Sequence, residues 1–417
     1  MRMLVLNSGS SSVKFRVFEY GREGSSHEVC LNRTLIKGAV KGIGSTASFE
    51  YEIEDYPGTK TTRLISDHQQ AIHWMFEQLE RFEREGHHQC SLAGVEAVGH
   101  RVVHGGERFS QPVVITEEVL GEIDVLSELA PLHNPACLEG IRGARAILGT
   151  RVPMVAVFDT AFHRTMPTHA KVYALPYELA DRYHIRRYGF HGIAHASLAG
   201  NYFDKTGKPS QESRLITLQL GNGCSISAIK GGQSLETSMG FTPLEGLVMG
   251  SRSGDLDPSI VNYLCQKEKV DPSEVDRWLN EQSGLLGLSG RTNDMRELLQ
   301  AAEREQHEPS QMAIEVFCYR IKKYIGAYLA VLGGADAIVF GGGIGEAAPV
   351  IRRRICEGME WCGLRLDHAR NKAAIGLQQG DVMQISQDGQ PLGMYVGAAD
   401  EETWIARETV RCLKATQ

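Results

Sequence analysis

The chain has 417 residues, of which 42% are hydrophobic and 23% charged, and its formal net charge is −7. This length and composition predict a globular protein with enough chain for two domains, and the negative charge argues against a surface for nucleic acid or anionic membranes. The nine cysteines include no CxxC pair, and no apolar run is long enough to span a membrane. We therefore expect a soluble, cytoplasmic protein without a signal peptide and with neither a membrane nor a nucleic acid as partner.

Residues 4–17 predict two short strands joined by a turn. Residues 4–6 are apolar, and from residue 13 apolar and polar side chains alternate, as in a strand with one buried face. The turn at residues 7–12 is rich in serine and glycine, and Lys14 follows it closely. Backbone and hydroxyl donors beside a lysine suit a phosphate group, although an ordinary serine-rich hairpin has the same pattern.

The same design returns at residues 215–229, where a strand leads through Gly221, Asn222 and Gly223 into a second alternating strand. Two such hairpins in one chain indicate a duplicated domain with a nucleotide between the halves. A third glycine-rich stretch, residues 335–346, predicts a strand, a turn and a helix start. It lacks the last glycine of GxGxxG, and the chain has no GxxxxGK[ST], so neither the dinucleotide fingerprint nor a P-loop is present.

Between the first two hairpins, apolar residues at helical spacing predict a helix over residues 72–82. The segment at residues 97–109 then reads as a strand end and a glycine turn carrying Arg101 and His104. An arginine beside Val102 and Val103 suits a small carboxylate with a short alkyl tail, because the guanidinium can bind the acid bidentately. A surface arginine in a loop is the alternative for this segment alone.

A proline-bounded loop at residues 130–135 carries His133, and an apolar strand at residues 152–158 ends at Asp159. A carboxylate at the end of a buried strand is typical of a catalytic acid or metal ligand in α/β enzymes. The capping of a following helix explains Asp159 equally well.

The second half contains further polar side chains in glycine-rich segments. His191 and His195 lie four residues apart, but without a third ligand we discount a metal and expect His191 to donate to an anion. Arg252 lies in a long loop at residues 236–258, and a second loop at residues 285–296 is polar. Helices are predicted over residues 312–332 and from Glu401 onward, where the acidic start complements the helix dipole.

Nine segments together identify the chain as similar to the acetate kinase family: NSGSSSVKF, GHRVVHGG, APLHNP, VFDTAFH, YGFHG, LGNG, SMGFTPLEGLVMGSRSGDLDP, VFGGGIGE and EETWIARET. They occur in the family's order and cover nearly the whole chain. The resemblance implies an α/β fold of the duplicated actin-like, sugar-kinase type, with two domains around a nucleotide cleft. The implied domains are residues 1–163 plus 402–417, for the acyl group and phosphate, and residues 164–401, for the nucleotide.

The resemblance also implies the reaction ATP + acetate ⇌ ADP + acetyl phosphate by direct in-line transfer, with Mg²⁺ (replaceable by Mn²⁺), in a homodimer. Its catalytic residues are Arg101, Asp159, His191 and Arg252. Its acyl-pocket residues are Arg101, Val103, Leu132, His133, Phe190 and Pro243. Its metal-binding residues are Asn7, Asp159 and Glu401. Its nucleotide-binding residues are Ser10, Ser12, Lys14, Gln219, Gly221, Asn222, Gly223, Asp294, Met295, Arg296, Gly342, Gly343, Ile344, Gly345, Ala347 and Ile351.

Several positions depart from the family pattern on the nucleotide side. Gln219 replaces a histidine, so it can donate a hydrogen bond but carries no charge. Gly341 and Ala347 replace a threonine and an asparagine around the third glycine turn, residues 292–293 replace two serines, and Asp400 adds a negative charge beside the expected metal site. These changes put nucleotide selectivity in question, whereas the acyl-side motifs are intact.

Three alternatives to an ATP-dependent acetate kinase stay open. A kinase for propionate or another short-chain acid has the same motifs, and one methylene is worth only about 1–3 kcal/mol of discrimination. A different phosphoryl donor would follow from the altered adenine loop. A nucleotide-binding regulator of the same fold is the third, although it would be expected to have lost part of the catalytic set.

Overall fold

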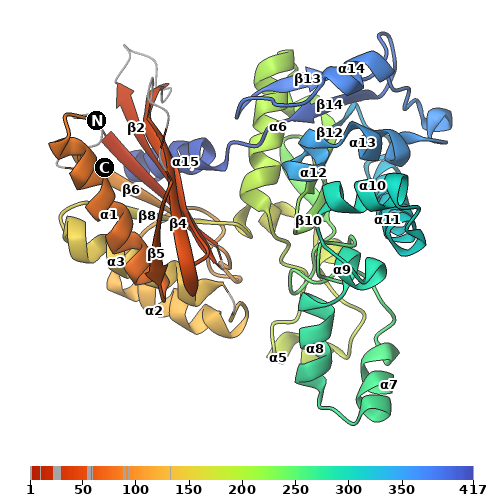
Figure 1. Ribbon diagram of the computed structural model, residues 1–417, viewed down its shortest axis with the longest axis horizontal. Coiled ribbons are helices and arrows are strands. Elements are labelled where there is room, and N and C mark those ends of the chain that lie inside the picture. Colours follow the sequence, from red (N-terminus) through yellow and green to blue (C-terminus); the bar gives the residue numbers. More distant parts are fainter. Residues whose placement is uncertain are drawn as a thin grey trace. The chain divides into compact units, whose positions relative to one another are not determined.

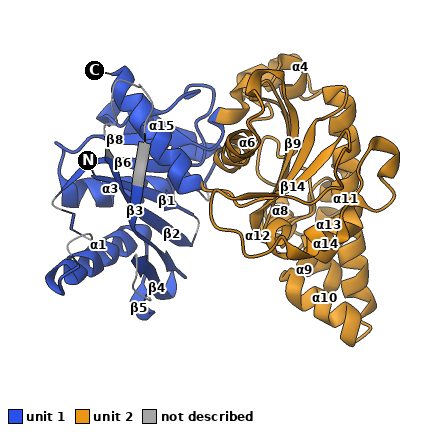
Figure 2. Ribbon diagram, turned by 90° about the horizontal axis from the view of Figure 1, so that it is seen from above, with its two compact units in different colours: residues 1–161, 401–417 blue, residues 162–400 orange. Residues whose placement is uncertain are grey.

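The computed structural model describes residues 2–9, 11–21, 30–53, 58, 60–87, 91–92, 94–131 and 133–416. The chain divides into two compact units: unit 1 is residues 1–161 with residues 401–417, and unit 2 is residues 162–400 (Figure 2). Each unit is built on one mixed sheet with helices on both faces, which is an α/β architecture (Figure 1).

The sheet of unit 1 has eight strands in the order β5-β4-β3-β2-β1-β6-β8-β7. The strands are β1 (Arg2–Ser8), β2 (Ser12–Gly21), β3 (Cys30–Lys41), β4 (Ser45–Ile53), β5 (Thr61–Ile65), β6 (Val95–Val102), β7 (Val113–Val114) and β8 (Met154–Phe158). β1, β6 and β8 are mutually parallel, and the outer pairs are antiparallel. β8 is buried along its whole length, as expected for a strand covered on both faces.

Helices α1 and α3 cover one face of this sheet, and α15 packs on the other (Figure 1). The helices of unit 1 are α1 (His68–Arg84), α2 (Glu117–Val125), the 3₁₀ turn η2 (Leu126–Glu128), α3 (Asn134–Leu148) and α15 (Glu401–Ala415). The side chain of Asp67 caps α1 by accepting a hydrogen bond from the Gln70 N–H. α15 reaches unit 1 only after the chain has passed through unit 2, so unit 1 is discontinuous in sequence.

The sheet of unit 2 has six strands in the order β11-β10-β9-β12-β14-β13. The strands are β9 (Arg214–Leu220), β10 (Cys224–Lys230), β11 (Gln233–Thr237), β12 (Ala337–Gly341), β13 (Val382–Gln384) and β14 (Gly393–Gly397). Helix α6 lies on one face, and α11, α12 and α13 lie on the other (Figure 1).

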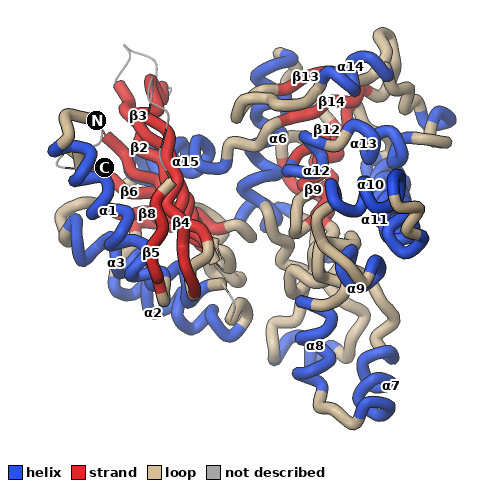
Figure 3. The backbone as a smooth tube through the Cα atoms, in the orientation of Figure 1, coloured by secondary structure: helices blue, strands red, loops and turns tan. Residues whose placement is uncertain are grey.

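The remaining elements of the chain are helical. They are η3 (Ala161–Thr165), α4 (Thr168–Lys171), α5 (Tyr177–Arg182), α6 (Gly192–Thr206), η4 (Ser210–Glu212), α7 (Ser259–Glu268), α8 (Pro272–Glu281), α9 (Gly284–Ser289), α10 (Met295–Arg304), α11 (Glu308–Leu332), α12 (Gly342–Ala347), α13 (Pro349–Cys356), η5 (Glu360–Cys362) and α14 (His368–Ala373). Residues 238–258, between β11 and α7, contain neither helix nor strand (Figure 3).

The two sheets share a six-strand pattern. The order β3-β2-β1-β6-β8-β7 in unit 1 corresponds strand for strand to β11-β10-β9-β12-β14-β13 in unit 2. The strand directions also correspond: in both units a hairpin leads into three parallel strands and an antiparallel edge. This agreement supports the duplication that the two glycine turns indicate.

Most predicted elements are present with longer bounds, and three differ. The described part of the segment predicted at residues 31–54, which ends at residue 53, forms two long strands instead of several short ones, because β3 and β4 extend the hairpin sheet. The segment at residues 97–109 continues as strand through Val102, since β6 pairs on both edges. The loop predicted at residues 285–296 contains α9 and the first turn of α10. No described helix is long and apolar enough to cross a membrane.

Candidate active site

Three predicted residues of unit 1 lie at the carboxyl ends of its parallel strands. Asn7 is on β1 and pairs in register with Arg101 on β6, and Asp159 follows β8 directly. α/β proteins bind ligands at this edge of the sheet, because the strand ends and their loops converge there. The topology therefore brings together residues that are far apart in the sequence.

Arg101 and Asp159 form an ion pair. The Arg101 Nη2 atom lies 2.8 Å from Asp159 Oδ2, and the side chains are only 14% and 2% exposed. Burial by itself lowers the pKa of Arg101, but the charges of Asp159 and Glu401 more than offset this, so the pKa is raised. The guanidinium is thus a permanent cation, and the role of Asp159 as a site residue stays a prediction.

Asn7 connects this pair to the first turn of α15. Its Oδ1 accepts a hydrogen bond from Arg101 Nη1 (3.3 Å), and its Nδ2 donates to Glu401 Oε2 (3.0 Å) and Glu402 Oε1 (3.3 Å). Glu402 lies 3.5 Å from the guanidinium of Arg16, and both side chains are 6% exposed. Glu402 therefore does more than complement a helix dipole: it is half of a buried ion pair that fixes α15 against β2.

The predicted metal ligands supply oxygen atoms only: two carboxylates, Asp159 and Glu401, and the amide of Asn7. The described part of the chain contains no group of three or more His, Cys, Asp or Glu side chains that could hold a metal by itself. Mg²⁺ is usually bound through one or two carboxylates and completes its shell with water and substrate phosphates. These residues therefore fit Mg²⁺ or Mn²⁺ better than a metal that needs a closed protein cage.

The first glycine turn is tightly held. The Gly9 N–H donates to the Ser12 carbonyl oxygen (2.8 Å), and His68 Nε2 at the start of α1 lies 2.7 Å from the Gly9 oxygen. Lys14 is exposed on β2. Ser10 lies outside the described residues. The predicted phosphate contacts of this turn stay predictions.

The predicted acyl pocket draws on both units. Val103 is buried, and His133 immediately precedes α3; both lie in unit 1. Phe190 is buried, and Pro243 lies in the long loop; both are in unit 2. Leu132 is outside the described residues. His133 was expected in a loop, but Asn134 and Pro135 already begin α3, since proline favours the first turn of a helix.

The second glycine turn, between β9 and β10, is braced by two loops. Gly221 N–H donates to the Gly223 oxygen (3.1 Å), and Gly250 N–H donates to the Asn222 oxygen (2.8 Å). Asn293 Nδ2 donates to Asn222 Oδ1 (3.2 Å). A Cβ atom on Gly250 would come within 2.0 Å of that same Oδ1, so a larger residue at this position would displace the Asn222 side chain.

His191 and Arg252 meet at this turn. A Cβ atom on Gly223 would lie 3.4 Å from His191 Nε2 and 3.7 Å from Arg252 Nη1, which places both donors against the turn. Burial lowers the pKa of Arg252. Its Nη1 contacts the Pro243 carbonyl oxygen at 3.3 Å. The turn thus has the side chains of a histidine and an arginine against it, and their contact with an anion stays a prediction.

Asp294 and Arg296 bind each other. Asp294 is the N-cap of α10, where it accepts from the Arg296 N–H (2.8 Å), and Arg296 Nη2 lies 2.6 Å from its Oδ2. The hydrogen bonds from the Arg296 side chain lower the Asp294 pKa to about 2. Met295 is buried. Their expected contacts to adenosine stay predictions.

The third glycine turn connects β12 to α12. Gly342 has φ = +75°, and a Cβ atom there would lie 2.6 Å from the Leu220 oxygen, so the turn requires glycine. The other residues predicted to contact the nucleotide here differ in exposure: Gly343 and Ala347 are exposed, Ile344 is half-buried, and Gly345 and Ile351 are buried.

The sequence profile of the acetokinase family matches residues 2–407. The chain belongs to this family. An acetate kinase from Solibacter usitatus is 48% identical over 413 residues, which cover 99% of this chain and 98% of that protein. The solved acetate kinase of Porphyromonas gingivalis has a TM-score of 0.87 at 37% identity and covers 99% of each chain. A propionate kinase from Francisella tularensis has a TM-score of 0.86 at 39% identity, covering 98% of this chain and 99% of that one.

These likenesses confirm the expected actin-like type of kinase fold for this member of the acetokinase family. Its Gln219, the main departure near the phosphates, pairs in register with Ser225 on β10 and with Gly341 on β12. In the described residues its buried Oε1 atom accepts no hydrogen bond. A buried acceptor without a donor is costly, so a ligand or water that donates here would be favoured.

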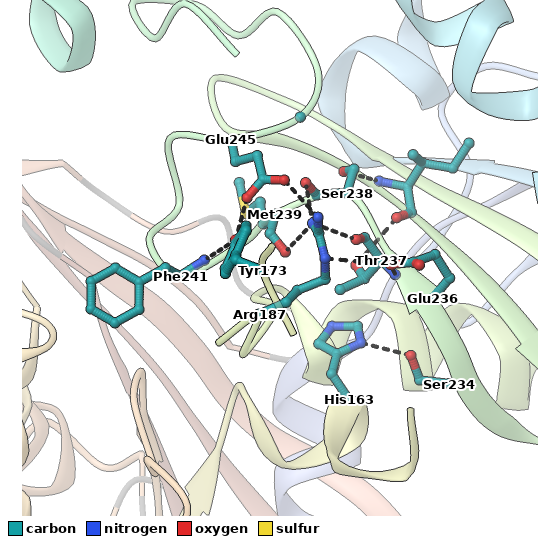
Figure 4. Close-up of polar contacts among 12 residues, drawn as sticks. His163, Tyr173, Arg187, Ser234, Glu236, Thr237, Ser238, Met239, Phe241 and Glu245 are labelled. Carbon is teal, nitrogen blue, oxygen red and sulfur yellow. Dashed lines mark hydrogen bonds and ion pairs between the residues drawn. The ribbon is translucent and has the colours of Figure 1, made fainter. Parts of the chain in front are cut away.

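The sequence gives no sign of the role of Arg187. Its Nη1 donates to the carbonyl oxygens of residues 237–239, and its Nη2 lies 2.6 Å from Glu245 Oε1 (Figure 4). The Tyr173 hydroxyl donates to Glu245 and accepts from the Phe241 N–H. This network fixes the start of the long loop at residues 236–258, which carries Arg252. Two adjacent arginines precede YGFHG, and no pattern indicates which of them makes these contacts.

A second unpredicted arginine, Arg352 on α13, is fully buried. It donates to the carbonyl oxygens of Gly345 (2.7 Å) and Glu346 (2.8 Å), and to the side chain of Asn371 (2.8 Å). Burial lowers its pKa to about 10. Arg352 thus holds α12 in place, and with it the third glycine turn.

Proposed function

We propose that this protein catalyses reversible, Mg²⁺-dependent phosphoryl transfer from ATP to acetate, giving acetyl phosphate and ADP by direct in-line transfer. The observation that carries the proposal is the connected set of Asn7, Arg101, Asp159 and Glu401 at the strand ends of unit 1. Full-length likeness to acetate kinases supports the choice of reaction.

The chemical demand of this reaction is electrostatic. Acetate is already an anion near pH 7, so it needs no strong base, but it must approach a triphosphate that repels it. Arg101 binds the carboxylate, and Arg252 with His191 stabilises the charge that spreads over the transferring group. Lys14, Ser12 and Asn222 contact the β- and γ-phosphates. The proposal requires the residues of both units to act on one pair of substrates.

Asp159, Glu401 and Asn7 would hold the metal. A divalent cation supplies charge that offsets the repulsion between the phosphate oxygens and draws electrons from the bridging oxygen. Arg101 orients Asp159 by its 2.8 Å contact, so the carboxylate is positioned before a metal binds.

The adenosine would lie between the α10 cap and the third glycine turn, with Asp294, Arg296, Gly343 and Ile344 around it. Val103, Leu132, Phe190 and Pro243 would surround the methyl group. The altered adenine loop bears on ATP selectivity, which the choice of phosphoryl donor in the assay tests, and the homodimer and the cytoplasmic location stay predictions.

A hydroxamate assay for acyl phosphate tests the proposal. Acetate, propionate and butyrate are each combined with ATP, GTP and pyrophosphate, with Mg²⁺, with Mn²⁺, and after chelation. We expect the highest rate with acetate and ATP, loss of activity on chelation, and recovery with either metal. Absence of product from every pair, in a folded protein that binds nucleotide by calorimetry, would contradict the proposal and favour a regulator.

A propionate kinase is the second candidate, because the solved propionate kinase is as similar in fold as the acetate kinase. The two differ by one methylene in the acyl pocket, worth about 1–3 kcal/mol. The ratio of kcat/KM values for acetate and propionate in the same assay separates them.

A further inference from the structure

Two histidines of unit 2 share one serine hydroxyl. His191 Nδ1 lies 2.9 Å from Ser225 Oγ, and His195 Nε2 lies 2.7 Å from the same atom. The other nitrogen of His195, Nδ1, lies 2.8 Å from Thr217 Oγ1. His195, Ser225 and Thr217 are fully buried. A continuous hydrogen-bonded chain therefore runs from β9 through α6 and β10 to His191, which the proposed function places at the transferring phosphoryl group.

The backbone holds His191 in a costly conformation. Its φ is +56°, in the left-handed region that non-glycine residues rarely adopt, and it is the N-cap of α6. This conformation directs Nδ1 to Ser225 and leaves Nε2 beside Gly223 and Arg252. The strain is maintained because the ring is bound on one side and faces the glycine turn on the other.

Proton counting allows two orientations of the Ser225 hydroxyl. Ser225 has one proton, so it donates to one histidine and accepts from the other. If it donates to His191 Nδ1, neutral His191 carries its proton on Nε2, and His195 has the Nε2–H tautomer. If it donates to His195 Nε2, it accepts from His191 Nδ1–H, and His195 has the Nδ1–H tautomer and donates to Thr217. His191 is cationic in this second orientation when Nε2 is protonated as well, and neutral when Nε2 is not.

We propose that Thr217, His195 and Ser225 form a reversible relay that lets His191 present an N–H to the glycine turn in both its neutral and its cationic state. The inference rests on the proposed function for the role of His191. The two states differ by one proton, which the cationic state carries on His191 Nδ1. In that state the Ser225 hydroxyl donates to His195 Nε2, and His195 carries its own proton on Nδ1 and donates to Thr217 Oγ1. The relay residues position His191 and do not touch the substrates.

The surroundings keep the relay neutral except at His191. Burial, followed by the charges of His163 and His191, lowers the His195 pKa well below its usual value. The other titratable or charged groups at this site are His163, Arg252 from the long loop, and Cys224 on β10, whose pKa burial raises to about 12. His195 therefore changes tautomer without changing charge.

NMR of the full-length protein labelled with ¹⁵N-histidine tests this inference. The two-bond ¹H–¹⁵N pattern of each ring reports charge and tautomer, and the His191→Gln variant assigns one ring. At every pH from 5 to 9 we expect neutral His191 to accompany Nε2–H His195, and cationic His191 to accompany Nδ1–H His195. Any other combination, or a cationic His195, would overturn the relay.

His163 is an internal reference for this measurement. Its Nε2 lies 3.0 Å from the Phe190 carbonyl oxygen, which can only accept, so this nitrogen keeps its proton. Its Nδ1 lies 2.8 Å from Ser234 Oγ (Figure 4). The His163 ring is therefore expected to keep one tautomer over the whole pH range.

Variants provide a second readout with a matched control. Ser225→Ala removes the shared hydroxyl, so the His195 tautomer should become independent of His191, and kcat should fall about tenfold with little change in KM. Ser225→Thr should restore the coupling. Ser227→Ala is the control: this serine is buried on the same strand, and its Oγ has no hydrogen-bond partner in the described residues. It should leave both coupling and kcat unchanged.

The NMR result is independent of turnover, so the two hypotheses fail separately. Coupled tautomers in a protein that makes no acyl phosphate would contradict the proposed function and support the relay. Acyl phosphate formation with an uncoupled His195 would contradict the relay alone.

Discussion

The two units have the same six-strand topology but differ in the electrostatics of their polar clusters. In unit 1 the buried charges are paired: Arg101 binds Asp159, and Arg16 binds Glu402. In unit 2 the cluster at the glycine turn is held by neutral groups, the hydroxyls of Ser225 and Thr217 and the ring of His195. The same strand topology therefore carries two kinds of polar cluster. In unit 1 the charged side chains are paired with each other, and in unit 2 the cluster is held by neutral groups.

Arg252 makes the difference clear. Within the described residues no carboxylate lies within ion-pair distance of its guanidinium, which contacts the Pro243 carbonyl oxygen and the Met249 sulfur. Burial lowers its pKa, whereas the pKa of Arg101 is raised. A partly buried cation without an anion is costly, and the cost is relieved when an anion binds. The cluster of unit 2 therefore favours binding of an anion at Arg252. In unit 1, by contrast, Arg101 and Asp159 already pair with each other.

The largest expected effect is on turnover. Arg101→Ala and Arg252→Ala should each lose roughly 3–5 kcal/mol of transition-state stabilisation, a drop of several hundredfold or more in kcat, because each removes a cation that offsets charge repulsion. Steady-state kinetics with acetate and ATP measure it. Arg277→Ala, an arginine exposed on α8, is the control and should keep normal turnover. Near-normal kcat in either active-site variant would refute the assignment of that arginine.

The second prediction separates the two arginines by stability. Arg101→Met leaves Asp159 buried without its partner and should lower the free energy of unfolding by about 3–5 kcal/mol. Arg252→Met removes an uncompensated cation and should change it by no more than about 1 kcal/mol. Urea unfolding followed by circular dichroism compares the variants. Equal losses in both would mean that Arg252 has an ionic partner after all.

The third prediction concerns the buried pair that attaches α15. Glu402→Gln removes the carboxylate charge of this buried pair and should cost about 3 kcal/mol of stability. Glu408→Gln, on the same helix and paired with the exposed Arg411, should cost about 1 kcal/mol or less. Both are measured by urea unfolding, and a smaller loss for Glu402 than for Glu408 would contradict the importance of the pair.

The smallest expected effect is on the pH dependence of stability, and it follows from a comparison of two buried histidines, His195 and His100. His195 has hydrogen bonds at both nitrogens, whereas in the described structure His100 Nε2 has none. Burial lowers the His100 pKa from 6.5 to about 3. Between these values the unfolded chain binds a proton that the folded chain does not, so stability falls as pH falls through this window, by about 1.4 kcal/mol per unit.

His100→Leu removes this titration, so its loss of stability between pH 6.5 and 5.0 should be smaller than that of the wild type by about 2 kcal/mol. Urea unfolding at the two pH values measures the difference. His73→Leu, at an exposed position on α1, should leave the wild-type loss unchanged. An unaltered loss in His100→Leu would mean that His100 is protonated in the folded state.

The strands and the turns can be predicted from the sequence, but which strands pair with each other in the sheet cannot. Alternation predicts β1 and β2, and glycine spacing predicts their counterpart β9–β10, because both signals are local. The ion pair between Arg101 and Asp159 is not local: it depends on β6 and β8 lying side by side, which periodicity cannot specify. Family resemblance, not spacing, brought these residues together in the prediction.

The unpredicted contacts share one property. The Ser225 hydroxyl and the Arg187 network lie between segments that are distant in the chain, and their residue types are common in loops and strand faces. A serine on an alternating strand gives no indication of whether it faces a histidine or solvent. Helix α9 was missed because Gly284, Gly287 and Gly290 resemble a loop, although Gly284 and Gly290 only bound a short helix in which Gly287 is an interior residue.

The discontinuity of unit 1 has a consequence for synthesis. Glu401 and Glu402 lie 394 and 395 residues after Asn7, to which both are hydrogen bonded. At about 5–20 residues per second, a ribosome needs roughly 20–80 s to supply them after Asn7 has been made. A nascent chain therefore has the first glycine turn without its acidic partners, and it acquires the complete cluster only when α15 emerges.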